Sequence, residues 1–84
     1  MEFVTRMGLN LTRDFDGSYV ATPSDKEPWS IHGTPKKIDA GSRVSVSGSA
    51  TRLLPSGQYW LLRCKAMETR IPFLIHEKDF DRVM

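Results

Sequence analysis

Cationic and aromatic residues on one predicted strand pair are the side chains of this sequence best suited to binding a charged ligand. Residues 42–54 and 59–67 are predicted to be two strands joined by a turn, and one face of this pair carries Arg43, Tyr59, Arg63 and Lys65. Arginine and lysine can hold nucleic-acid phosphates while an aromatic ring stacks on a base. These four residues are therefore a candidate nucleic-acid surface, although alternating charges also occur on the solvated face of an ordinary antiparallel sheet.

A second candidate surface lies in the proline-rich stretch 23–35, which is predicted to be a long loop. Trp29 and Ile31 lie inside it, and a solvated linker has little reason to carry two large apolar side chains. An aromatic anchor beside prolines is typical of protein interfaces. Trp29 and Ile31 are thus candidate protein-binding residues; the alternative is that Trp29 covers the open end of a small barrel.

The residue patterns of catalysis and metal binding are absent from the sequence. His32 and His76 lie far apart, with no second ligand at helical or hairpin spacing. The single cysteine, Cys64, falls on an apolar strand face, where a thiol behaves as a small hydrophobe. No serine lies in a GxSxG context, and no glycine-rich phosphate loop precedes a helix. We therefore expect no catalytic residue, metal or cofactor, and hence a protein that is not an enzyme.

The composition is that of one small soluble domain spanning residues 1–84. With 39% hydrophobic and 26% charged residues, the chain can form one core and has no room for a second. The formal net charge of +2 does not by itself predict nucleic-acid binding. One cysteine favours a reducing compartment and no apolar stretch approaches the roughly 20 residues that span a bilayer, so we expect a cytoplasmic protein without a membrane segment. So short a chain buries a modest core, which leaves homo-oligomerisation open.

Turn residues and period-2 alternation predict the elements that position these side chains. Asp16-Gly17 predicts a hairpin over residues 7–22, and Gly48 predicts a bulge within 42–54. Residues 55–58, Pro-Ser-Gly-Gln, reverse the chain into the strand 59–67. Residues 69–75 are predicted to be an edge strand because Pro72 lacks an amide donor, and residues 76–84 a helical turn. Alternation assigns one face of the strand 59–67 to the core: Trp60, Leu62, Cys64 and Ala66.

These elements predict a mainly β fold, a small five-stranded, partly open SH3-like barrel with a short C-terminal helical turn. An OB-like barrel is the alternative, because residues 44–48, 59–62 and 71–73 resemble the first three strands of that fold. A compact domain without catalytic chemistry favours a non-catalytic protein-binding module, such as an adaptor, an inhibitor or an assembly subunit. Its contact surface would be the Trp29 loop or an exposed sheet edge; the alternative is a nucleic-acid-binding barrel that uses Arg43, Tyr59, Arg63 and Lys65. A protein partner is favoured over a nucleic acid.

Overall fold

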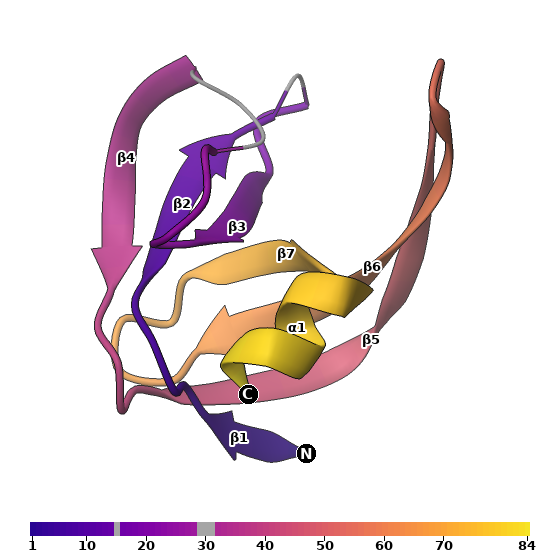
Figure 1. Cartoon of the computed structure of the whole chain (residues 1–84). Coiled ribbons are helices and arrows are strands. Elements are labelled where there is room, and N and C mark those ends of the chain that lie inside the picture. Colours follow the sequence, from indigo (N-terminus) through magenta and orange to yellow (C-terminus); the bar gives the residue numbers. More distant parts are fainter. Residues whose placement is uncertain (15, 29–31) are drawn as a thin grey trace.

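Seven strands and one short helix make up the fold, as the computed structural model of residues 1–14, 16–28 and 32–84 shows (Figure 1). The elements, in chain order, are β1 (Glu2–Val4), β2 (Leu9–Arg13), β3 (Tyr19–Pro23), β4 (His32–Ile38), β5 (Arg43–Leu54), β6 (Gly57–Ala66), β7 (Pro72–His76) and α1 (Glu77–Val83). The mainly β class and the C-terminal helical turn are confirmed.

The strands form one open sheet in the order β1-β5-β6-β7-β3-β2-β4, antiparallel except for the parallel pair β3–β7. The prediction of five strands is wrong, because two further segments extend the sheet. β1 pairs with the start of β5, and β4, which takes residues 32–35 from the predicted loop, pairs with β2. Within the described part of the chain, β1 and β4 have no neighbour on their outer sides. The sheet is therefore not closed into a barrel, and neither the SH3-like nor the OB-like arrangement is confirmed.

The hairpin β2–β3 forms around Asp16-Gly17 as predicted. Gly17 has a φ of 84°, in the left-handed region that a side chain would strain. The Asp14 amide donates to the Ser18 carbonyl at 2.8 Å, and the Gly17 amide donates to the Asp14 carbonyl at 3.0 Å. The turn is thus specified by local residue chemistry.

The hairpin β5–β6 also forms as predicted, and its turn is Pro55-Ser56. Leu54 pairs with Gly57, whose φ of 134° again requires glycine. The bulge expected at Gly48 is present, because Val46 lies opposite Cys64 whereas Gly48 lies opposite Arg63. One extra residue on β5 is therefore accommodated there, and the hairpin bends at this point.

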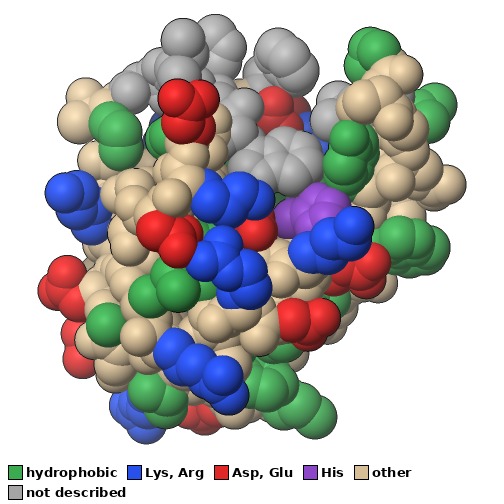
Figure 2. Space-filling view, in the orientation of Figure 1, with side chains coloured by type: hydrophobic (Ala, Val, Ile, Leu, Met, Phe, Trp, Pro, Cys, Tyr) green, Lys and Arg blue, Asp and Glu red, His purple; other side chains and the backbone are tan. Residues whose placement is uncertain are grey.

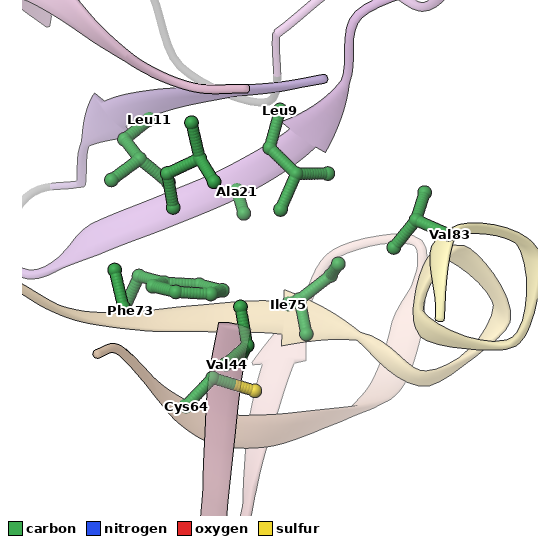
Figure 3. Packing of buried hydrophobic residues seen from close by; sticks show 10 residues of the cluster. Leu9, Leu11, Ala21, Val44, Cys64, Phe73, Ile75 and Val83 are labelled. Carbon is green, nitrogen blue, oxygen red and sulfur yellow. The ribbon is translucent and has the colours of Figure 1, made fainter. Parts of the chain in front are cut away.

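The hydrophobic core lies between the β2–β3 pair and the bent sheet of β5, β6 and β7 (Figure 3). Leu9, Leu11 and Ala21 face Phe73 and Ile75 of β7 across this interior, as Figure 3 shows. The remaining buried members of the cluster come from four other elements: Ile38, Val44, Cys64, Ala66 and Val83. The helix thus contributes to the core through Val83, which is fully buried.

The predicted inner face of β6 is correct for only half of the strand. Cys64 and Ala66 are buried, but Trp60 is 52% exposed, and Leu61, expected on the outer face, is 1% exposed. β7 covers β6 only from Leu61 to Lys65, so residues 57–60 extend past the covered part of the sheet. Leu61 pairs with His76, which directly precedes α1. The Leu61 side chain is buried on the face of β6 opposite to Cys64 and Ala66. Simple alternation fails because the core does not extend along the whole strand.

The prediction that residues 69–75 form an edge strand is wrong, because β7 lies inside the sheet between β6 and β3. Pro72 is tolerated since it is the first residue of β7 and pairs only with Lys65 of β6. The parallel partner β3 joins β7 further along, at Leu74 and Ile75. The missing amide of Pro72 therefore faces no neighbouring strand.

Two ion pairs tie the segment after β3 to α1. The Lys26 Nζ lies 3.0 Å from Oδ1 of Asp79, whose side chain is only 4% exposed, and Arg82 lies 2.5 Å from Asp25. The helix starts at a cap in which Nδ1 of His76 accepts the Lys78 amide. Among the described residues, no helix is long and apolar enough to cross a membrane.

Candidate functional site

The distal part of the β5–β6 hairpin, residues 48–60, projects from the sheet as a two-stranded arm (Figure 1). β1 accompanies β5 only over Arg43–Ser45, and β7 accompanies β6 only from Leu61 onward. In the described ranges of the chain, no third strand pairs with this arm. Both edges of the arm are therefore without a neighbouring strand among the described residues.

One face of the arm, its inner face, is anchored to the body of the protein. The Arg52 guanidinium lies 2.5 Å from Asp14 and 3.2 Å from Asp16, both in the β2–β3 turn. The Tyr59 ring meets the His76 ring edge-on, with 5.5 Å between centroids. Arg52 and Tyr59 pair across the two strands, so both anchors act at one level of the arm. These contacts hold the arm in a defined orientation.

The carboxylate of Asp16, which contacts Arg52, is held in place by a hydrogen bond and kept negatively charged. Its Oδ1 accepts the Ser18 amide at 3.0 Å. The backbone hydrogen bond from Ser18, then the side-chain hydrogen bond with Ser18, and then the charge of Arg52 hold the pKa of Asp16 below its ordinary value. The turn therefore keeps a negative charge opposite the arm.

The opposite, outer face of the arm carries two exposed apolar side chains and no charge. It consists of Ser49, Thr51, Leu53, Gln58 and Trp60, which the pairing of β5 with β6 places on one side. Leu53 is 84% exposed and Trp60 is 52% exposed. Apolar side chains stand out along the arm at the right of Figure 2. A strand face that merely contacts water usually carries charges, whereas here the one charged side chain, Arg52, points inward.

A groove of about 1110 Å³ lies on the other side of the hairpin, between the β2–β3 turn and the bend of β5–β6. Its lining includes four cationic side chains and one carboxylate: Arg13, Arg52, Arg63, Lys65 and Asp16. Ser45 and Ser47 add hydroxyl groups beside the two cations of β6. The groove is thus suited to an anionic ligand.

An arginine stacked on a tyrosine forms one wall of this groove. The Arg13 Cζ lies 4.4 Å from the centroid of the Tyr19 ring. Nη1 of Arg13 donates to the Gly17 carbonyl at 2.7 Å, and Nη2 donates to the Tyr19 hydroxyl at 3.1 Å. Lys36 Nζ is 5.9 Å from the same ring. The guanidinium plane is therefore held in one orientation.

The structure separates the four residues predicted to bind nucleic acid. Arg63 and Lys65 are exposed and lie together in the groove. Arg43 lies near β1, 3.9 Å from Glu2, and Tyr59 is on the inner face of the arm, so neither lines the groove. The predicted protein-binding residues, Trp29 and Ile31, lie outside the described residues.

The structure also adds residues that sequence reasoning missed. Arg13 and Tyr19 are direct partners across the hairpin β2–β3, whereas counting outward from a two-residue Asp16-Gly17 turn would pair Tyr19 with Asp14. The sequence therefore does not give this register, and it gives no signal for Leu53 and Trp60 either. The alternation of residues 59–67 indicates two faces but not how far along the strand the core reaches.

The other candidate reactive groups are structural. Burial raises the pKa of the Cys64 thiol from 9.0 to about 12, so the thiol is neutral and unreactive at physiological pH. Nowhere in residues 1–14, 16–28 and 32–84 do three His, Cys, Asp or Glu side chains meet in a group that could hold a metal ion. Oδ2 of Asp79 is buried and has no hydrogen-bond partner in the described structure.

Comparison of the chain with protein-family models, with curated proteins and with solved structures finds no match. The arm and the groove are therefore interpreted from their own geometry and chemistry.

Proposed function

We propose that this protein is a non-catalytic protein-binding module whose contact surface is the outer face of the arm. The observation that carries this proposal is the exposure of Trp60 and Leu53, which occupy diagonal positions on an uncharged face of a two-stranded projection. Tryptophan is enriched among the residues that dominate binding energy in protein interfaces. Large exposed apolar groups that lie next to each other, rather than singly, are typical of interaction sites.

The anchored inner face supports the same proposal. Arg52 and Tyr59 hold the arm against the body, so its outer face is presented without a large loss of conformational freedom on binding. Preorganisation of this kind raises affinity because less flexibility is lost when the complex forms. The anchoring also explains why an exposed hairpin keeps its shape without a third strand.

The partner that we propose is a second copy of this chain, docked outer face to outer face. The face has no charge to repel its own copy, and a two-fold axis would place Trp60 of each subunit against Leu53 of the other. A standard interface covers about 800 Å² of each partner, about a seventh of the 5405 Å² surface of this protein. The outer face of the arm has five residues, whereas a standard interface has about 20–30 on each side, so we expect a weak dimer that dissociates in the micromolar range, in the role of an assembly subunit.

Sedimentation velocity over about 1–200 µM, a range that brackets micromolar dissociation constants, tests the proposal. We expect the wild-type protein to shift from monomer to dimer. Thr51→Lys places a charge beside Trp60 on the outer face and should keep the protein monomeric, because docking would bury an unpaired ammonium group.

Thr34→Lys is the matched control, since Thr34 is also an exposed strand threonine but lies on β4 at the far edge of the sheet. It should dimerise like the wild type. A wild-type protein that remains monomeric at the highest concentration, or equal effects of the two lysines, would contradict docking through the arm.

A further inference from the structure

We propose that the groove between the β2–β3 turn and the bend of β5–β6 binds single-stranded nucleic acid. Arg63 and Lys65 would contact the phosphates, and the stacked pair Arg13–Tyr19 would contact the bases. None of these four residues lies on the outer face of the arm, so their contacts do not depend on the proposed dimer. It retains two of the residues identified in the sequence and replaces Arg43 and Tyr59 by Arg13 and Tyr19.

The cationic side chains that line the groove differ in whether they already have a carboxylate partner. Arg52 is neutralised by Asp14 and Asp16. Arg63 and Lys65, by contrast, are exposed, and no carboxylate of the described residues lies within ion-pair distance of either. Because Arg52 is already paired with two carboxylates, an anion in the groove would be attracted to Arg63 and Lys65 instead.

The spacing of these two cations suits a chain of anions rather than one anion. They are two positions apart on β6, so they lie on the same face, about 6.7 Å apart at a rise of about 3.3–3.4 Å per residue. Ser45 pairs directly with Lys65 and places a hydroxyl group beside it. Successive phosphates of an extended strand can each meet one cation in this arrangement.

The Arg13–Tyr19 stack supplies a surface on which nucleobases can stack, which a phosphate site alone lacks. Its hydrogen bonds to Gly17 and to the Tyr19 hydroxyl fix the guanidinium plane, and the Arg13 side chain is exposed. Nucleobases stack on aromatic rings and on arginine planes when they are unpaired. A duplex keeps its base faces covered, so this wall favours a single strand. An acidic peptide would use the cations but gain little from the stack.

Fluorescence anisotropy with a labelled single-stranded oligonucleotide of mixed sequence, titrated at several salt concentrations, tests the site. For two neutralised phosphates we expect the logarithm of the association constant to fall with the logarithm of salt at a slope of about −1.4, because each contributes about −0.7. Arg63→Gln/Lys65→Gln should bring the slope close to zero and weaken binding at least about tenfold at low salt. Tyr19→Leu should weaken binding about tenfold with little change in slope, because it removes stacking and no charge.

Lys37→Gln/Arg43→Gln is the matched control. It also removes two exposed cations, but neither lines the groove, so affinity and slope should change much less. The proposal is overturned if this control matches Arg63→Gln/Lys65→Gln, if the wild type shows no binding at low salt, or if a duplex or a polyglutamate peptide binds as tightly as the single strand. Leu53→Gln removes an exposed apolar side chain from the outer face and lies outside the groove lining, so it should weaken the dimer and bind the oligonucleotide like the wild type. A failure of the dimer and a failure of the groove are therefore distinguishable.

Discussion

The strongest test of this structure is a lysine placed at each of two neighbouring residues of β6, Trp60 and Leu61. Alternation along the strand predicts that Trp60 is core and Leu61 is solvated, whereas the structure shows the reverse, with exposures of 52% and 1%. The two variants therefore show which of these two side chains is buried.

The expected magnitudes follow from burial. A domain of this length has a free energy of unfolding of about 4–13 kcal/mol, at about 0.05–0.15 kcal/mol per residue. Leu61→Lys loses the packing of a buried leucine, about 2–5 kcal/mol, and adds the cost of a buried charge, so we expect a loss of at least about 5 kcal/mol. Trp60→Lys should lose no more than about 1.5 kcal/mol, because the ammonium group stays in water while the aliphatic stem keeps part of the contact.

Far-UV circular dichroism during thermal unfolding measures both variants. At about 4–8 °C per kcal/mol for a domain of this size, Leu61→Lys should lower Tm by more than about 20 °C or abolish the cooperative transition. Trp60→Lys should lower Tm by at most about 12 °C. Protein concentration should be below the midpoint of self-association, because a dimer would add to the apparent stability of the wild type. Equal damage from the two variants, or greater damage from Trp60→Lys, would refute the assignment of the arm.

Two further predictions concern the ion pairs of α1 and the buried thiol. Lys26→Ala should lower the free energy of unfolding in urea by about 2–3 kcal/mol, because it leaves the buried Asp79 carboxylate without its cation. Asp25→Ala breaks the exposed pair with Arg82 and should lower it by less than about 1 kcal/mol. Equal losses would show that the burial of Asp79 is not important. Cys64 should react with a thiol reagent at pH 8 only after unfolding. Because its pKa is raised to about 12 in the folded protein, the free energy of unfolding should fall as pH rises above 9, by about 1.4 kcal/mol at pH 10. Cys64→Ala should remove this decrease.

Local residue chemistry accounts for the features that could be predicted from the sequence. Asp16-Gly17 and Pro55-Ser56-Gly57 specify their turns because positive φ at Gly17 and Gly57 depends on a few adjacent residues only. The bulge at Gly48 and the terminal helix are likewise local. The pairing of Arg63 with Lys65 in one site also follows from the sequence, since residues two apart on a strand share a face.

Long-range pairing accounts for what could not be predicted. Pro72 indicated an edge strand, but β3 joins β7 only beyond this proline, which places β7 inside the sheet. β1 and β4 become strands because each finds an open neighbour, and their own residues gave little sign of it.

The sequence by itself therefore determined the two hairpins, the mainly β class and the separation of β6 into two faces, because these depend on φ preferences and on the period of two. Only the tertiary structure decided which face is buried at each point along β6. Burial depends on where neighbouring strands end, so the switch from core to solvent between Leu61 and Trp60 reflects the point at which β7 stops. The same long-range arrangement brings the β2–β3 turn up to the bent hairpin and creates both the anchored arm and the groove.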